Sequence, residues 1–325
     1  MRKVLLVCFD NLGDLVFTSA LAAALSSDPQ SELSVWCKDY TSSVARLMPG
    51  VKQVFASDPF WDSAPGRPKG SFWNFVLVLR RVRRERFVLA ILPSTSWKAA
   101  LALLLAGIPK RVAWKGKKNS LFLSAVTPKP RRDEPVIAAL AKSFAPFLPR
   151  PAESRSCLEK QRLPSWTEPL PPKPLALIHA FAGRLDRCAD PQLLWRFAQY
   201  LESQAYHVLW VGTDHELKQL AKALPELPKS AYADAARYDL LPLAALIEKS
   251  QLFIGHDSGP LHVATALGIP VLGMYLPGQP ERAFPQGRGP SIYIVKSRPA
   301  ELSFDDLSQA LIQLTRDAPI SMRYG

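Results

Sequence analysis

The chain has 325 residues, of which 48% are hydrophobic and 21% are charged, and it carries a formal net charge of +13. This length predicts two domains, or at most three, and the composition excludes a wholly disordered chain. The longest uninterrupted apolar run, Ala99–Ile108, has about half of the ~20 residues that a bilayer-spanning helix needs.

Short apolar runs alternate with longer segments of helical periodicity in the first half of the chain, which is typical of parallel α/β structure. The apolar run at the N-terminus is broken at Asp10 and no small-residue cleavage site follows it, so we predict a first strand there and no signal peptide. The predicted strands are Val4–Phe9, Leu33–Trp36, Gln53–Phe55, Val88–Leu92 and Lys110–Ala113. The predicted helices are Asp14–Leu25, Tyr40–Met48, Phe72–Glu85, Trp97–Ala106 and Pro135–Phe147.

A proline-rich break over residues 151–174 carries little periodicity, and the alternation restarts after it. We therefore predict an N-terminal domain over residues 1–150, a linker over 151–174 and a C-terminal domain over 175–325, with the last helix a candidate to pack back on the first domain. The predicted strands of the second half are Leu175–His179, His207–Val211, Leu252–Gly255, Val271–Tyr275 and Ile292–Val295. Its predicted helices are Pro191–Ser203, Asp214–Leu224, Leu241–Ser250, Pro260–Leu267 and Phe304–Thr315.

The excess positive charge lies entirely in the first half. Residues 1–150 contain 23 Lys and Arg against 10 Asp and Glu, whereas residues 151–325 contain 18 of each. The densest run supplies Arg80, Arg81, Arg83 and Arg84, which predict a surface for an anionic acceptor or for anionic lipid headgroups; a solvated helix face is the alternative. No zinc-finger or RNP-like pattern accompanies the charge, so nucleic acid is not an expected partner.

The sequence predicts no metal site. Its four cysteines, Cys8, Cys37, Cys157 and Cys188, form no CxxC pair and stand at no zinc-ligand spacing with histidine. Without an export signal we expect reduced thiols in the cytoplasm.

The motif GHDSGPLH is the most informative one in the second half. In doubly wound sheets ligands bind beyond the carboxyl ends of the strands, and here Asp257, Ser258 and Gly259 form a turn directly after a predicted strand. Pro260 opens a helix, whose free N–H groups and dipole favour an anion, and His262 adds a donor in the first turn. The motif therefore predicts a diphosphate site, with an ordinary capped helix as the alternative.

Two other loops of the second half carry charged residues after strands. Arg184 and Arg187 can bind phosphate bidentately, or they can be surface arginines paired with Asp186 or Asp190. Glu216 can accept ribose hydroxyls, or it can simply complement the dipole of the helix that it begins.

In the first half, the sequence FDNLGD follows the first predicted strand. Asp14 is a candidate general base for a substrate hydroxyl, and Asp10 is the second candidate. The alternative is that Asp14 only caps the helix that follows. The loop has neither the GxGxxG nor the GxxxxGK[ST] pattern, which argues against a dinucleotide or P-loop site here.

Two segments together resemble glycosyltransferase family 9, the ADP-heptose:lipopolysaccharide heptosyltransferases. They are NLGDLVFTSALAAAL near the N-terminus and FIGHDSGPLHVATALGIPVLGMYLPGQPERAFP near the C-terminus. The resemblance implies the GT-B fold, in which two Rossmann-like doubly wound α/β domains face each other across a cleft. It also implies roles for the motifs: Asp14 as the catalytic base, and Asp257, Ser258, Gly259 and His262 as ligands of the donor diphosphate.

The same resemblance assigns the remaining donor contacts. A basic residue after the first strand of the second domain contacts the phosphates, which matches Arg187, although the Trp that usually follows is absent and Arg184 is the substitute. The ribose-binding acid of the family matches Glu216, and a residue near Tyr238 would lie against the nucleobase.

The function implied by the resemblance is inverting transfer of a sugar, heptose from ADP-heptose, onto a hydroxyl of a lipopolysaccharide-core-type acceptor. The partners would be a nucleotide-sugar donor and an anionic lipid-linked glycan, for an enzyme that lies in the cytoplasm with peripheral contact to the inner membrane. No metal or other cofactor is expected. Two alternatives stay open: a related nucleotide-sugar transferase that modifies a protein or another glycan, and a nucleotide-sugar binder without catalytic activity.

Overall fold

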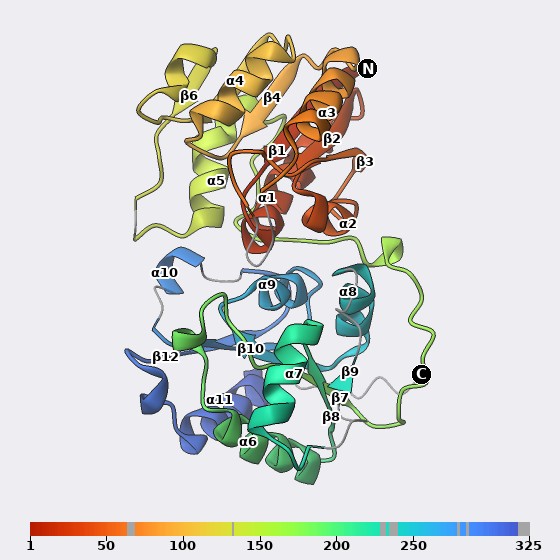
Figure 1. Cartoon of the computed structure of the whole chain (residues 1–325), viewed down its shortest axis with the longest axis vertical. Helices are drawn as coiled ribbons and strands as arrows, with labels where there is room; N and C mark the ends of the chain where they lie inside the picture. The colour runs from red at the N-terminus through yellow and green to blue at the C-terminus, as the bar shows by residue number, and fades with distance from the viewer. Residues whose placement is uncertain are drawn as a thin grey trace. The chain divides into compact units, whose positions relative to one another are not determined.

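The chain folds into two compact units, Met1–Arg162 and Leu163–Gly325, each built on a six-stranded parallel sheet (Figure 1). The structure is a computed structural model, and it describes residues 1–63, 69–131, 133–227, 232–233, 240–277, 280–283 and 286–317. Among these residues, no helix is both long enough and apolar enough to cross a membrane. The two parallel sheets with their helices confirm the predicted doubly wound α/β architecture in both halves.

The first unit has its strands in a Rossmann-like order. They are β1 (Arg2–Cys8), β2 (Ser31–Cys37), β3 (Val51–Ala56), β4 (Leu89–Leu92), β5 (Lys110–Trp114) and β6 (Ala125–Thr127). The order in the sheet is β3-β2-β1-β4-β5-β6, with Leu5 of β1 opposite Ser34 of β2 and Ala90 of β4. The chain thus changes direction between β1 and β4, and such a switch point is where doubly wound sheets bind ligands.

Helices cover both faces of this sheet. They are α1 (Leu12–Leu25), α2 (Ser42–Ala45), α3 (Phe72–Arg84), α4 (Trp97–Leu105) and α5 (Val136–Phe144). The helical spacing of Phe75, Val78 and Val82 buries one stripe of α3, which shares a hydrophobic core with α4 and with one face of β1. α1 packs against α2 and α5 on the other face. The crossover from β1 to β2 and the crossover from β4 to β5 run in opposite directions across the sheet. Because each crossover is right-handed, the helices α1 and α4 lie on opposite faces.

The second unit repeats this plan. Its strands are β7 (Leu175–His179), β8 (His207–Val211), β9 (Tyr232–Ala233), β10 (Leu252–His256), β11 (Val271–Tyr275) and β12 (Ser291–Val295). Its helices are α6 (Pro191–Ser203), α7 (Asp214–Ala223), α8 (Leu240–Lys249), α9 (Gly259–Ala266), α10 (Pro280–Ala283) and α11 (Phe304–Asp317). The sheet order is β12-β11-β10-β7-β8-β9, so its switch point lies between β7 and β10.

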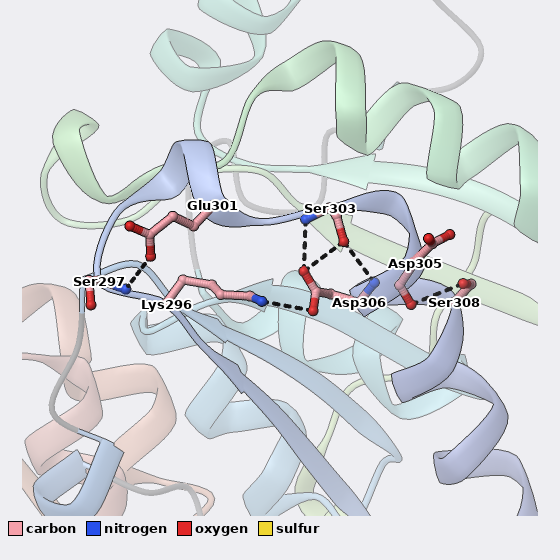
Figure 2. Close-up of polar contacts among 7 residues, drawn as sticks. All are labelled: Lys296, Ser297, Glu301, Ser303, Asp305, Asp306 and Ser308. Atoms are coloured by element: carbon pink, nitrogen blue, oxygen red, sulfur yellow. Dashed lines mark hydrogen bonds and ion pairs between the residues drawn. The ribbon is translucent and has the colours of Figure 1, made fainter.

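The last helix, α11, packs in the core of the second unit. Leu307, Leu311 and Leu314 are buried in the core that α6 and α7 also line. Figure 2 shows how the start of α11 is fixed: Asp306 accepts hydrogen bonds from Ser303, and the Lys296 ammonium at the end of β12 lies 2.8 Å from the Asp306 carboxylate. The apolar stripe of α11 is thus buried against β12 and α6.

The first unit extends twelve residues beyond the predicted end of its domain, to Arg162. The N–H group of Cys157 donates to the Ser19 hydroxyl at 2.9 Å, and that of Glu159 donates to the Leu47 carbonyl at 2.7 Å. The Arg162 guanidinium donates to the Val51 carbonyl at 2.8 Å. These bonds come from backbone and polar groups, which leave no periodic pattern in the sequence.

Candidate functional site

The switch point of the second sheet collects three of the predicted donor loops around one histidine, His179. This residue ends β7 and is 5% exposed. Its Nδ1 atom lies 3.3 Å from the Ser258 hydroxyl, and its Nε2 atom lies 3.8 Å from Oε2 of Glu216. The sequence analysis did not single out His179; its position as the last residue of a strand next to the switch point was the available signal.

The turn after β10 has the shape that the motif predicts. Ser258 is the N-cap of α9, yet its hydroxyl accepts no capping hydrogen bond from the helix, and Pro260 stands in the first turn. The buried His262 imidazole has Nε2 3.3 Å from Oδ1 of Asp257. This contact holds the Asp257 carboxylate within the turn. Free N–H groups at the amino end of a helix such as α9 favour an anion.

A second histidine, His256, anchors the arginine loop to β10. Its side chain is buried, and its Nε2 accepts a hydrogen bond of 2.8 Å from the Ala189 N–H group. Burial, together with the nearby charge of His179, lowers the pKa of His256 to about 3, so its ring is neutral at physiological pH. His256 therefore fixes the end of the loop that carries Arg184 and Arg187 without adding charge to the site.

The structure shows Glu216 in the second of its two predicted roles, at the start of α7. It forms a capping box with Thr213: its Oε2 accepts from the Thr213 N–H at 2.7 Å, and the Thr213 hydroxyl accepts from the Glu216 N–H. Burial alone would raise the pKa of Glu216, but the hydrogen bond and charge of His179, with the Thr213 donors, lower it to about 2. Within the described residues, Oε1 receives no hydrogen bond, so one carboxylate oxygen is available for a ligand hydroxyl.

The two arginines of the donor loop differ in their partners. Arg184 forms a bidentate pair with Asp186, at 3.0 and 2.6 Å, and both side chains are exposed. Arg187 is half-buried, and in the described part of the chain its guanidinium has no acidic partner. The predicted pairing with aspartate therefore holds for Arg184, which leaves Arg187 as the arginine whose charge is available to a phosphate.

A cavity of about 470 Å³ lies beside this loop, on the side of α6 and α7. It is lined mainly by apolar side chains, among them Phe181, Leu185 and Leu220. None of the predicted donor residues lines it, and Tyr238, the residue expected against the nucleobase, lies outside the described residues. The predicted donor residues therefore lie in the polar loops around His179 and not in this cavity.

Asp14 lies at the switch point of the first sheet, in the first turn of α1. The N-cap of this helix is Asn11, and the Leu12 N–H group donates to the Tyr40 hydroxyl at 3.1 Å. Asp14 is the third residue of the helix and is exposed, so it is not the N-cap. The capping alternative for Asp14 is wrong, and its carboxylate stands one turn beyond the end of β1.

Asp10 precedes it by four residues and is electrostatically coupled to it. Asp10 keeps one side in solvent, but the surrounding protein and the negative charges of Asp14 and Asp62 raise its pKa to about 6, against the opposing charge of Lys38. The Lys38 ammonium is buried and lies 3.0 Å from Asp62. Two carboxylates thus share the edge where β1 ends.

This coupling predicts a pH-dependent stability. The pKa of Asp10 is higher in the folded protein than in the unfolded chain, so the folded state loses stability as pH rises from about 4 to about 6 and does not regain it above that range. We expect Asp10→Asn to raise the melting temperature at pH 7.5 and to leave it unchanged near pH 4, measured by thermal denaturation at both values. An equal shift at both pH values would contradict the raised pKa, and Asp28→Asn, which removes a carboxylate of lowered pKa, should lower the melting temperature at pH 7.5.

The arginine run of α3 lies away from this edge. Glu85, directly after α3, forms an ion pair with Lys3 at the start of β1, whereas Asp10 follows the end of β1. Seven strand residues separate the two ends by about 20 Å. The structure therefore does not bring Arg80, Arg81, Arg83 and Arg84 to Asp14, as an acceptor site would require. Sequence reasoning missed this because a helix that returns to the next parallel strand ends at the opposite edge of the sheet.

Among the described residues, no group of three or more His, Cys, Asp and Glu side chains is placed to hold a metal ion. Cys8 and Cys37 are buried thiols, as the apolar runs around them predict. Burial raises the pKa of Cys37 to about 12, so this thiol is protonated at physiological pH.

Comparison with known proteins gives these two units a family. The family model of glycosyltransferase family 9 (heptosyltransferase) matches residues 76–305. The chain is 23% identical over 312 residues to lipopolysaccharide heptosyltransferase 2 of Escherichia coli, covering 86% of this chain and 84% of that protein. A shorter match, 35% identical over 82 residues, is to the lipopolysaccharide core heptosyltransferase OpsX of Haemophilus influenzae and covers 25% of this chain and 24% of that protein.

The fold matches as well. The solved structure of Escherichia coli heptosyltransferase WaaC with ADP superposes with a TM-score of 0.75 at 16% identity, covering 96% of this chain and 100% of that one. At this identity the likeness shows the fold, which is the GT-B arrangement of two parallel α/β units expected from the sequence. The family model covers well over half of the chain, and the chain belongs to glycosyltransferase family 9, the heptosyltransferase family of GT-B glycosyltransferases.

Proposed function

We propose that this enzyme transfers heptose from ADP-heptose to a hydroxyl of a lipopolysaccharide-core-type acceptor, with inversion at the anomeric carbon. One observation carries the proposal: the amino end of α9, Glu216 and the arginine loop are tied to one edge of the second sheet by His179 and His256. The names of the relatives supply the sugar and the acceptor class, and one relative was solved with ADP.

In the donor site, each group has a distinct task. The N–H groups at the start of α9 and the Arg187 guanidinium hold the diphosphate, and the free Oε1 of Glu216 accepts a ribose hydroxyl. Ser258 supplies a hydroxyl donor, while Asp257 and His262 fix the turn. Because Glu216 stays ionised down to about pH 2, its acceptor role is constant over the working pH range.

The transfer is a single displacement. An acceptor oxygen forms a bond to the anomeric carbon while the bond from that carbon to the ADP β-phosphate oxygen breaks, and the electron pair leaves with ADP. Asp14 takes the proton of the acceptor hydroxyl as the new bond forms. A back-side attack of this kind inverts the anomeric configuration.

The departing diphosphate gains negative charge as it leaves. We propose that the amino end of α9 and Arg187 stabilise this charge, in the way that preorganised donors stabilise a developing anion. Turnover is then expected to continue in the presence of EDTA. Loss of turnover in EDTA that added Mg²⁺ restores would contradict this part of the proposal.

The donor is tested by thermal shift with ADP, UDP, GDP and CMP. We expect ADP to raise the melting temperature most, because a ligand stabilises the state that binds it by a free energy that grows with the logarithm of ligand concentration over Kd. A larger shift with UDP or GDP would overturn the proposed base. Product analysis with ADP-heptose then separates the activities. Heptosylation of a lipopolysaccharide-core acceptor supports the proposal, whereas a product formed only with a protein or another glycan indicates the related transferase. If the chain neither transfers the sugar nor hydrolyses the donor, it is a binding protein.

A further inference from the structure

Exposed apolar side chains lie where α3, α4 and the 3-10 helix η2 (Asn119–Phe122) begin. The exposed fractions are 73% for Trp73, 49% for Phe72, 40% for Trp97 and 80% for Leu121. Phe60, in the loop before α3, is also exposed. We call these five residues the rim. Most monomers expose apolar side chains singly, so a group of this size marks a surface that meets a partner.

The rim lies at the edge of the first sheet that carries Asp10 and Asp14. α3 follows the loop after β3, α4 begins five residues after the end of β4, and η2 follows β5, so all three start beyond the carboxyl ends of their strands. The two helices are neighbours in the structure (Figure 1), and the Arg83 guanidinium at the far end of α3 donates to the Leu105 carbonyl of α4.

A chain of ring contacts connects the rim to the catalytic edge. Ring centroids are 5.4 Å apart for Phe72 and Trp73, 5.0 Å for Phe60 and Phe72, and 4.7 Å for Phe60 and Trp61. Trp61 in turn lies 6.4 Å from Phe9, the residue directly before Asp10. The rings of Phe60, Phe72 and Trp73 are therefore held by packing against the residues that precede Asp10.

The charge along the part of the chain that carries Trp97 and Leu121 has one sign. Residues 86–132 contain ten Lys and Arg and no Asp or Glu. The loop after β5 exposes Lys117 and Lys118 beside Leu121, and the Lys98 ammonium lies 5.9 Å from the Trp97 ring centroid. Aromatic rings beside lysines are the composition that proteins place at the boundary between lipid headgroups and acyl chains.

We infer that the rim docks on an anionic lipid surface, with Trp73, Trp97 and Leu121 in the interface and Lys117 and Lys118 on the headgroups. This docking holds the edge with Asp10 and Asp14 at the lipid surface, where a lipid-linked acceptor would be found. The second statement rests on the proposed function, whereas the docking does not. The inference also replaces the arginine run of α3 as the principal membrane contact.

Vesicle binding tests the docking without donor or acceptor. The probe is co-sedimentation with vesicles that contain phosphatidylglycerol, compared with phosphatidylcholine vesicles. We expect Lys117→Gln with Lys118→Gln to weaken partitioning to the anionic vesicles about 25-fold, since each cation near such a surface contributes about fivefold. Trp73→Ser with Leu121→Ser should weaken it at least about tenfold through lost apolar burial.

The chain offers a matched control at the far end of α3. Arg80→Gln with Arg84→Gln removes the same charge from exposed positions and should change partitioning less than about threefold. If the arginine double variant weakens partitioning to the anionic vesicles as much as the lysine double variant does, the arginine run is the membrane contact and the proposal for the rim is wrong. Unchanged binding by the Trp73 and Leu121 double variant would also overturn it.

A second copy of the chain is the competing partner for an apolar surface. If the rim joined two copies, Trp73→Ser with Leu121→Ser would lower the mass measured by sedimentation in the absence of lipid, and that result overturns the lipid assignment. All variants should keep the ADP-induced thermal shift of the unmodified chain, because the donor residues lie in the other unit. Failure of the proposed function would instead show as loss of that shift with vesicle binding intact.

Discussion

Replacing Asp14 by asparagine is expected to reduce kcat by about 10²- to 10⁴-fold, the range that loss of a positioned general base produces. Asparagine keeps the size of the side chain and cannot take the proton of the acceptor hydroxyl. Asp14 belongs to the first unit and the proposed diphosphate ligands belong to the second, so ADP affinity measured by calorimetry should stay within about twofold. The measurement is steady-state transfer with saturating donor and acceptor, together with calorimetry on the same preparation.

Asp10→Asn is the matched control for Asp14→Asn, because both remove one carboxylate from the same edge. Asp10 has the raised pKa that candidate bases often show, but this shift comes first from burial and then from its neighbour. We expect Asp10→Asn to retain most of the turnover, since Asp14 is the position that the family resemblance marks as the base. A loss confined to Asp10→Asn, with Asp14→Asn active within a few-fold of the unmodified chain, would move the base to Asp10.

The strands and most helices were predictable from the sequence because a buried parallel strand leaves a strong local pattern. Strands such as Leu175–His179 are continuous apolar runs, and α3 shows its buried stripe as apolar residues at helical spacing. The very short elements were missed: β6, β9 and α10 have four residues or fewer, too few to establish a period. The helix predicted over 40–48 is only a 3-10 turn followed by the four-residue α2 for the same reason.

The contacts within the donor site could be predicted only in part. Ser258, Glu216 and the arginine loop follow strands, so topology alone places them at one edge. That His179 holds Ser258 and Glu216 together depends on which strand is the neighbour of β7, and only the sheet order decides this. The direction of α3 could not be predicted from charge. The density of arginines in residues 80–84 suggested an acceptor surface, but α3 runs toward the amino ends of the strands and places these arginines at the opposite edge from Asp14.

Replacing Arg187 by glutamine is expected to weaken ADP binding by about 10- to 100-fold, the cost of losing a charge-assisted hydrogen bond to phosphate. Arg187 is half-buried in a loop that His256 fixes through the Ala189 N–H group, so its guanidinium is positioned before the ligand arrives. Calorimetry with ADP measures the change. The melting temperature without ADP should be nearly unaffected, since no acidic partner in the described part of the chain loses a contact.

Arg184→Gln provides the comparison within the same loop. Its charge is already neutralised by the bidentate contact with Asp186 in an exposed position, so we expect ADP affinity to change by less than about twofold. Asp186→Asn then distinguishes the two arginines: it releases Arg184 and removes one negative charge from the loop. If Arg187 alone holds the phosphates, Asp186→Asn in the Arg187→Gln background recovers little of the lost affinity. Recovery to near the affinity of the unmodified chain would show instead that Arg184 reaches the phosphates once its carboxylate partner is gone.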